Sequence, residues 1–501
     1  MRQSASLKAA ALAAFAANGV VADSKFSLDT VGKNTPDSYQ LDSVTGYAAY
    51  HDAKRTASTL SFDAMQYYHG NESGETPGIL PGPPPAGDYY WWNGAALWSS
   101  LIEYWYYTGD STYNDVTMQG LLFQTGENND YMPFNYTATL GNDDQAFWAL
   151  AAMQAAERTF PDPPSDQPQW LQLAENVFQT MIGRWKPNDT CNGGLRWQIS
   201  AFNLGYDYVN SISTGGLFAL SSRLARYTAN ETYADWAEKT WTWMENANFI
   251  DNKTHAIYDG ANVQKNCTDI NKIEFSYVNA IFVLGAAHMY NHTDGDEKWK
   301  SRFDTLVDYG LDFFFPKGVA VERPCETVDS CTTDMQMFKG FLHQWYAQAI
   351  QLVPSAMERV LPTLQKSAKA AVSQCTGEIE SRQCGLHWES GEYDGTIGIN
   401  PELSVLNAVF SSFVSDSKAP VTAKDGGSSK AGGGSKGSGG SDEGSPEDDS
   451  GEDGDNGGSG KDGDKGGSGK DGDSRDAATA LGISSSLSAF AVISSVVIAL
   501  W

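Results

Sequence analysis

The sequence predicts an all-α protein in which about six helical hairpins close into an (α/α)6 barrel. Apolar residues recur at spacings of three and four over residues 95–105 and 147–153, which is typical of amphipathic helices. A Tyr-Thr-x-x-x-Thr-Tyr turn at residues 107–113 is repeated at residues 227–233, with a looser copy at 290–299. In each copy a helix rich in small and aromatic residues ends in the turn, and a second helix follows, so the repeating unit is a helical hairpin.

The first helices of the hairpins carry small residues at many positions. Glycine and alanine at 94–96 and 215–216 allow close approach of backbones, so we expect these helices to form the inner ring. The second helices are clearest at residues 236–244 and 299–313. An open helical solenoid would show the same repeat and is the alternative architecture. In chain order, the six first helices are expected to begin near Asn93, Asn142, Ser213, Tyr277, Met335 and Glu402.

The two ends of the chain carry the patterns of targeting segments. Arg2 and Lys8 precede an apolar run, which predicts a signal peptide over residues 1–22, cleaved after Ala22. Residues 477–501 contain no charged residue and nothing basic follows the apolar stretch, which is typical of a GPI-attachment signal that is removed. A membrane-spanning tail that is retained is the alternative. We therefore expect a secreted protein, GPI-anchored at the plasma membrane or the cell wall.

The region between these segments divides in two. Residues 416–476 are rich in Gly, Ser, Asp, Glu and Lys and contain no aromatic residue, so they are predicted to form a disordered stalk. Residues 23–415 remain as one folding domain. The formal net charge of the chain is −28, and most of it belongs to this domain. Such a surface repels phosphate backbones and argues against nucleic-acid partners, whereas a neutral glycan is compatible with it.

Cysteine and asparagine patterns also fit an exported domain. All six cysteines lie within residues 23–415, an even number that predicts disulfides. Six cysteines allow 15 connectivities; short separations favour Cys325 with Cys331 and Cys375 with Cys384, leaving Cys191 with Cys267. No cysteine pair has the spacing of a zinc site, so no metal and no cofactor are expected. Asn-x-Ser/Thr acceptors for glycans begin at Asn71, Asn135, Asn188, Asn230, Asn252, Asn266 and Asn291.

Two adjacent carboxylates, Asp143 and Asp144, stand where a loop is expected to meet a helix. Asn142 is predicted to cap this helix, with the Gln145 amide reaching back, and an acid in the first turn is also stabilised by the helix dipole without any chemical role. Retaining glycosidases need two carboxyl groups separated by about 5 to 5.5 Å, which neighbouring residues can provide. We expect the dipole to keep one group ionised as the nucleophile. The resulting charge would raise the pKa of the other, which then serves as the acid.

Four segments carry a specific resemblance: residues 90–94, 141–148, 191–198 and 384–388. Together they resemble glycoside hydrolase family 76, the α-1,6-mannanases, over residues 39–407. With its signal, stalk and apolar tail the chain is most similar to the fungal GPI-anchored branch implicated in cell-wall assembly. Asn192 and the stretch Phe341-Leu342-His343 depart from the family pattern, and these departures bear on substrate preference.

The resemblance implies an (α/α)6 barrel and retaining endo-cleavage of α-1,6-mannosidic bonds. It also implies that Asp143 is the nucleophile and Asp144 the acid/base. In the fungal branch the implied donor is α-1,6-mannan or the mannose of a GPI glycan. The glycosyl group would then pass to a β-glucan acceptor rather than to water.

Further residues of these motifs are candidates for substrate binding. Tryptophans can stack on sugar faces, although a tryptophan at helical spacing is more often part of the core. Arg196 could bind mannose hydroxyls or pair with an acid of this acidic domain, and the histidines form no triad. The candidates are Trp91, Trp92, Asn93, Gln145, Gly193, Gly194, Arg196, Trp197, Trp388 and Asp394.

Two other functions are compatible with these motifs. One is a non-catalytic GPI-anchored lectin or structural protein of the cell wall, although a binding module has no need for paired acids. The other is an (α/α)6 hydrolase that acts on a different glycan.

Overall fold

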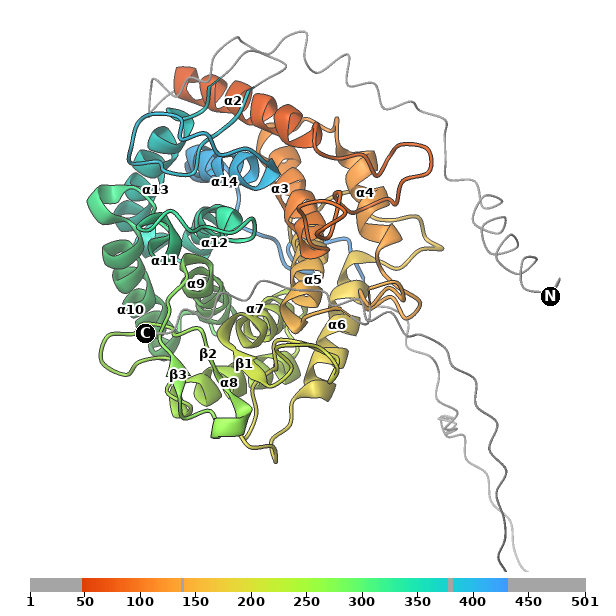
Figure 1. Cartoon of the computed structure of the whole chain (residues 1–501), viewed down its shortest axis with the longest axis vertical. Coiled ribbons are helices and arrows are strands. Elements are labelled where there is room, and N and C mark those ends of the chain that lie inside the picture. The colour runs from red at the N-terminus through yellow and green to blue at the C-terminus, as the bar shows by residue number, and fades with distance from the viewer. Residues whose placement is uncertain (1–46, 137–138, 377–381, 431–501) are drawn as a thin grey trace, which may run out of the picture. The chain divides into compact units, whose positions relative to one another are not determined.

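The computed structural model describes residues 47–136, 139–376 and 382–430. Twelve long helices form two concentric rings, and inner and outer helices alternate along the chain (Figure 1). The inner ring consists of α3 (Trp92–Thr108), α5 (Asn142–Glu157), α7 (Ser211–Thr228), α9 (Ser276–His292), α12 (Phe338–Leu352) and α14 (Ile399–Val409). The outer ring consists of α2 (Tyr47–Met65), α4 (Asn114–Phe123), α6 (Trp170–Arg184), α8 (Glu231–Asn246), α10 (Glu297–Phe314) and α13 (Met357–Val372). The predicted (α/α)6 barrel is confirmed.

The ring is closed, which excludes the open solenoid. The last inner helix, α14, packs against both α2 and α3 at the other end of the barrel sequence. Nearly every residue of the inner helices is buried, whereas the outer helices bury one face. Small residues make the inner ring possible: a Cβ on Gly216 would lie 2.6 Å from the Cβ of Ala146, so α7 and α5 approach closely only because this residue is glycine.

Shorter elements are concentrated in the connections. Three short strands, β1 (Tyr208–Asn210), β2 (Gly260–Asn262) and β3 (Ile270–Asn271), form an antiparallel sheet in the order β1-β2-β3. Isolated bridges join Arg196 to Val209 and Gly141 to Gln198, so this sheet is connected to the start of α5. This sheet was not predicted from the sequence. The remaining short helices are α11 (Arg323–Glu326), η3 (Val263–Lys265), η4 (Pro316–Gly318), η5 (Met335–Met337), η6 (Pro354–Ala356) and η7 (Phe410–Asp416).

The folded part continues beyond residue 415, where the domain was expected to end. Residues 417–430, here called the C-terminal strap, cross the end of the barrel where the inner helices finish. Arg226 Nη2 donates to the Pro420 carbonyl at 2.6 Å, and the Val421 amide donates to the Glu157 carbonyl at 2.9 Å. The prediction of a disordered stalk is therefore wrong for residues 416–430, because buried polar groups at the barrel end need these carbonyls and amides as partners.

The other expectations for the domain can now be compared with the structure. The three disulfides join Cys191 to Cys267, Cys325 to Cys331 and Cys375 to Cys384, as spacing favoured. All seven candidate glycosylation asparagines are exposed, and their occupancy stays a prediction. No helix among the described residues is long and apolar enough to cross a membrane. The expected signal peptide, residues 431–476 of the stalk and the GPI signal lie outside the described residues.

Candidate active site

Asp143 and Asp144 occupy the first turn of α5. Asp144 Oδ2 accepts the backbone N–H of Gly141 at 2.6 Å, and Asp143 Oδ1 accepts the N–H of Asp144 at 3.1 Å. The cap of this helix is Gly141, so the expected cap by Asn142 with Gln145 reaching back is wrong. The residue that reaches back is Asp144, because the helix begins one position earlier than the cap prediction assumed.

Asn142 and Gln145 have another role, which is to hold Arg184 against the start of α5. Arg184 Nε donates to Asn142 Oδ1 at 2.7 Å, and its Nη2 donates to Gln145 Oε1. Asn142 Nδ2 donates to the Arg196 carbonyl at 2.8 Å, and Gln145 Nε2 donates to the Asp130 carbonyl at 2.6 Å. Gln145 is fully buried. Its observed contacts position the helix start, and its predicted contact with substrate stays a prediction.

Burial dominates the electrostatics of the aspartate pair. Both side chains are only partly exposed. Burial, reinforced by the neighbouring charge of Asp144, raises the pKa of Asp143 well above its usual range. Burial also raises the pKa of Asp144 to about 6, although the Gly141 N–H acts in the opposite direction. Such a pair still holds a proton at mildly acidic pH, which general acid catalysis requires.

The structure brings two further titratable groups to the pair. Asp334 precedes η5, and burial together with the charge of Asp144 raises its pKa to about 7, while a hydrogen bond from Trp92 acts to lower it. Tyr277 lies in the first turn of α9. Burial raises its pKa well above the usual range, and the charges of Asp143 and Asp334 add to this effect. Both residues lie where inner helices start, at the same barrel end as Asp143 and Asp144.

The sequence analysis did not identify these two residues as parts of the site. One signal was available: Asp334 immediately precedes the position Met335, where an inner helix was expected to begin. Tyr277 was itself named as a helix start. The missing information was that the starts of α5, α9 and α12 come close together once the ring closes.

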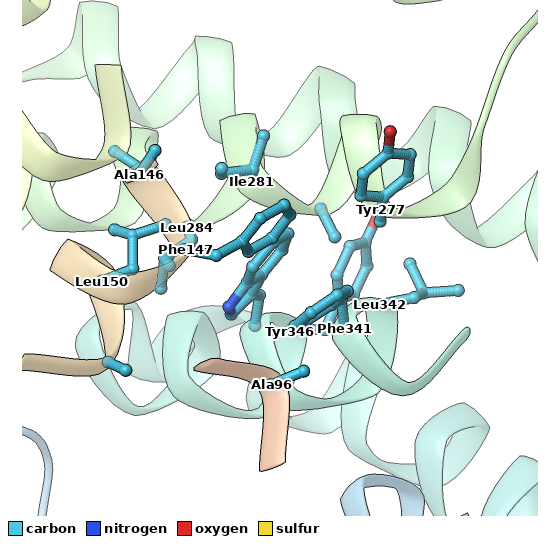
Figure 2. Packing of buried hydrophobic residues seen from close by; sticks show 14 of the residues in the cluster. Ala96, Ala146, Phe147, Leu150, Tyr277, Ile281, Leu284, Phe341, Leu342 and Tyr346 are labelled. Carbon is cyan, nitrogen blue, oxygen red and sulfur yellow. The ribbon is translucent and has the colours of Figure 1, made fainter. Parts of the chain in front are cut away.

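Aromatic side chains of α3, α5, α9 and α12 pack together near the starts of these helices. The ring centroids of Trp92 and Phe147 are 5.5 Å apart, and those of Phe147 and Phe341 are 5.0 Å apart. Tyr277 stacks on Phe338 at 3.8 Å. Figure 2 shows Phe147, Tyr277 and Phe341 approaching one another from three inner helices. These rings form an apolar cluster at the barrel end where the acids are buried, and burial is the main cause of their raised pKa values.

Several predicted substrate-binding residues turn out to be structural. Trp91 is buried, donates to Gln124 Oε1 at 2.8 Å and stacks on Trp148. Asn93 is fully buried and donates to Asn400 Oδ1 at 3.0 Å.

Two residues of the loop before α14 have similar roles. Trp388 is buried, and its indole donates to the Gly385 carbonyl at 3.2 Å. Asp394 accepts the backbone N–H groups of Leu386 and His387 at 2.8 and 2.7 Å, so it ties together the loop that it belongs to. Trp91, Asn93 and Trp388 are thus buried within the fold, whereas Asp394 is exposed, and a role of these four residues in substrate binding stays a prediction.

A turn formed by Gly193 and Gly194 leads the chain to the start of α5. Gly193 and Gly194 have φ values of 131° and 75°, and a Cβ on Gly193 would lie 2.6 Å from the Trp185 ring. Only glycine fits this left-handed turn. The chain then pairs with the start of α5, since the Asn142 N–H donates to the Trp197 carbonyl at 2.8 Å. Trp197 is partly exposed and remains a candidate for stacking on a sugar.

Arg196 contributes to a pocket adjoining the aspartate pair. Its guanidinium pairs with Asp189 at 2.5 Å and donates to the Tyr206 carbonyl at 3.1 Å. The pocket has a volume of about 500 Å³, and neither Asp143 nor Asp144 lines it. Its lining consists of Asn142, Arg184, Lys186, Pro187, Asn188, Asp189, Arg196, Gln198, Ile199 and Tyr206. Arg196 therefore pairs with an acid and also lines open space beside the site, and its binding of mannose hydroxyls stays a prediction.

Comparison with known proteins gives a consistent result. The model of "Glycosyl hydrolase family 76" matches residues 52–424. Mannan endo-1,6-alpha-mannosidase DCW1 of Saccharomyces cerevisiae is 41% identical over 381 residues, which cover 76% of this chain and 83% of the yeast protein.

Solved structures agree with the fold. The crystal structure of Dfg5 from Chaetomium thermophilum in complex with glucosamine is 47% identical, with a TM-score of 0.75, covering 79% of this chain and 96% of that one. An α-1,6-mannanase from Salegentibacter is 17% identical with a TM-score of 0.58, covering 72% of this chain and 98% of that one. At this identity the second likeness supports the fold alone.

Proposed function

Since this chain belongs to glycosyl hydrolase family 76, we propose that it is a retaining endo-α-1,6-mannosidase or transglycosidase, acting on mannan or GPI-glycan mannose at the fungal cell surface. The observation that carries the proposal is the pair Asp143 and Asp144 in one helical turn, with both pKa values raised by burial. The activity named for the yeast relative supports the substrate class.

In the proposed reaction the ionised Asp143 attacks the anomeric carbon of a mannose unit. Asp144 gives its proton to the departing glycosidic oxygen, and a covalent glycosyl-aspartate forms. Asp144, now ionised, takes a proton from water or from a sugar hydroxyl, whose oxygen then displaces Asp143 and restores the enzyme. The overall configuration at the anomeric carbon is retained because the carbon is inverted twice.

The roles of the two acids follow the family pattern, and the surroundings of the pair support chemistry at this helix start. The contacts of Arg184 with Asn142 and Gln145 hold the first turn of α5 in place. The apolar rings of Trp92 and Phe147 limit the access of water, which strengthens electrostatic interactions with the developing charge. We assign Trp92, Arg196 and Trp197 to sugar contacts, with Gly193 and Gly194 shaping the turn.

The choice between hydrolysis and transfer depends on the acceptor. Purified protein is incubated with an α-1,6-mannooligosaccharide, with and without a β-1,3-glucan oligosaccharide, and the products are followed by mass spectrometry. Shortened chains alone indicate hydrolysis, whereas products that join mannose to glucan indicate transfer. Absence of any reaction, together with retained sugar binding, would favour the lectin alternative.

We also propose that the protein is held at the cell surface by a GPI anchor, on the basis of the apolar and uncharged residues 477–501. Treatment of cells with a phosphatidylinositol-specific phospholipase C should release the protein from membranes. Retention after treatment would indicate a spanning tail or covalent attachment to the wall. Detergent extraction distinguishes these two results, because only a spanning protein is extracted.

A further inference from the structure

Asp334 has a carboxylate oxygen that is buried without a partner. Its Oδ1 is shielded from solvent and makes no hydrogen bond among the described residues. The carboxylate receives a hydrogen bond from the Trp92 side chain, and the residue as a whole is still partly exposed. A buried acceptor with no donor is unfavourable in a folded protein, so such an atom needs an explanation.

Structural roles do not supply one. Asp334 adopts helical φ and ψ angles and makes no side-chain cap hydrogen bond to η5, unlike Asp296, whose carboxylate caps α10. No lysine or arginine in the described part of the chain forms an ion pair with Asp334, whereas the buried Asp63 pairs with Arg382 at 2.8 Å. The carboxylate of Asp334 is thus neither a cap nor half of a salt bridge.

Its position relative to the aspartate pair points to a ligand. The charge of Asp144 acts on Asp334, and the charge of Asp334 acts on Asp143, so the three carboxyl groups share one small region. Tyr277 is the second residue of α9, and the charges of both Asp143 and Asp334 raise its pKa. The region therefore lies between the starts of α5, α9 and α12, where a substrate must sit to be cleaved by the pair.

The chemistry of the cluster defines the group that it accepts. Three carboxyl groups without a compensating cation exclude an anionic sugar, and they match a neutral polyol whose hydroxyls donate hydrogen bonds. Rotation of the carboxyl group about its Cβ–Cγ bond, at the expense of the Trp92 hydrogen bond, turns Oδ1 toward an incoming hydroxyl.

We propose that Asp334 binds the sugar at the cleavage point, accepting a hydrogen bond from one ring hydroxyl of the mannose unit held between Asp143 and Asp144. The proposal rests on the proposed function, because it takes that bond to be the one cleaved. It makes Asp334 a specificity-determining residue that selects a neutral hexose with a free hydroxyl at one defined position.

The test combines a variant with modified substrates. Wild-type protein and Asp334→Asn are each assayed on α-1,6-mannobiosides that lack one hydroxyl of the donor ring, namely the 2-, 3- and 4-deoxy compounds. In the wild type, kcat/KM for one of these compounds should fall by about 10- to 100-fold relative to the parent, the range for a hydrogen bond to a charged group. In Asp334→Asn, kcat/KM for the parent compound should be lower than in the wild type by a similar factor. Removal of the same hydroxyl from the substrate should then lower kcat/KM of this variant by at most about a further threefold.

A control and a second variant keep the result interpretable. Asp235→Asn, an exposed position on the outer helix α8, should leave the wild-type pattern unchanged. If the thermal melting curve shows that Asp334→Asn does not fold, Asp334→Ser is assayed on the same set of substrates. The proposal would be overturned if each deoxy compound lowered kcat/KM, relative to the parent, by the same factor in the wild type and in the Asp334 variant.

The two proposals fail in distinguishable ways. If the wild type cleaves α-1,6-mannobiosides and removal of each hydroxyl has the same effect on kcat/KM with and without Asp334, only the role of Asp334 is wrong. If the wild type shows no turnover, the affinities of wild type and Asp334→Asn for α-1,6-mannotriose are measured by calorimetry. Equal affinities overturn the role of Asp334, a weaker variant supports it, and absence of binding in the wild type overturns both proposals.

Discussion

Asp144 Oδ2 accepts the backbone N–H of Gly141 at 2.6 Å, so the carboxyl group closes back on the turn that carries it. This bond links the proposed acid/base to the N-cap of its own helix. Because the donor belongs to the backbone, the position of the carboxyl group is set by the fold of the turn. The aspartate pair is therefore pre-organised before substrate arrives.

Gly141 has no room for a side chain. A Cβ at this position would collide with Asp143 Oδ1 and lie 3.0 Å from Asp144 Oδ2, although its φ of −86° suits any residue. We expect Gly141→Ala to lower kcat by about 10- to 100-fold by displacing the acids, with a small change in melting temperature. Gly183→Ala is the matched control, because that helical position has nothing within 4 Å and should retain full activity. Equal kcat values for the two variants would contradict this account of the turn.

Replacing Asp144 by asparagine should change how stability depends on pH. The pKa of Asp144 is raised to about 6 in the folded state, from about 3.9 in an unfolded chain. The folded state therefore binds the proton more tightly, and the wild type loses stability as pH rises from about 4 through 6. Asp144→Asn lacks this loss, so its melting temperature should match the wild type near pH 4 and exceed it by a few degrees at pH 8. Melting curves across this range check the sign, and a variant that is less stable at pH 8 than the wild type contradicts it.

The rate should require one proton on the aspartate pair. Asp143 and Asp144 interact strongly enough to titrate as a unit, and only the singly protonated form has both a nucleophile and an acid. We expect a bell-shaped dependence of kcat/KM on pH, with activity lost on the alkaline side once both groups are charged. A profile measured with α-1,6-mannotriose between pH 3 and 9 tests this. Activity that keeps rising up to pH 9 would show that no carboxylic acid donates the proton.

The C-terminal strap should stabilise the barrel. Arg226 is buried and donates to the Pro420 and Val421 carbonyls of the strap, whereas Arg359 is exposed and pairs with Asp304 and Asp308. Arg226→Gln should lower the free energy of unfolding by about 1 to 3 kcal/mol, because buried carbonyls lose their donor. Arg359→Gln should stay within about 0.5 kcal/mol of the wild type, as expected for a surface ion pair. Urea unfolding measures both.

Truncation gives an independent check of the same contact. A chain of residues 23–430 should melt several degrees above a chain of residues 23–415, because the shorter one leaves Arg158 and Arg226 without the carbonyls of Lys418 and Pro420. Equal melting temperatures would mean that the strap adds nothing to stability and that the domain ends where the composition changes.

Most of the fold could be predicted from local patterns. The predicted helix starts at Asn93, Asn142 and Tyr277 lie within one residue of the observed starts of α3, α5 and α9. These helices were recognisable because the inner ring needs small residues and because each hairpin repeats a polar turn. The sheet and the strap were missed, since neither has a strong hydrophobic period and both are held by contacts with distant parts of the chain.

The candidate site was predictable only where it is contiguous in sequence. Asp143 and Asp144 are neighbours, so their proximity needs no fold, whereas Asp334 reaches them only through closure of the ring. The motif residues Asn93 and Trp388 could not be separated from sugar-binding residues, because burial is invisible in a sequence. The helix dipole was expected to keep one acid ionised, but burial has the larger effect on both pKa values.

The parallel arrangement of the inner helices separates stability from chemistry in this barrel. The proposed reactive residues lie at the helix starts, and the strap crosses the opposite end, roughly 24 Å away if α5 spans 16 residues at 1.5 Å each. Changes in the strap can therefore weaken the fold while the geometry around the acids is preserved.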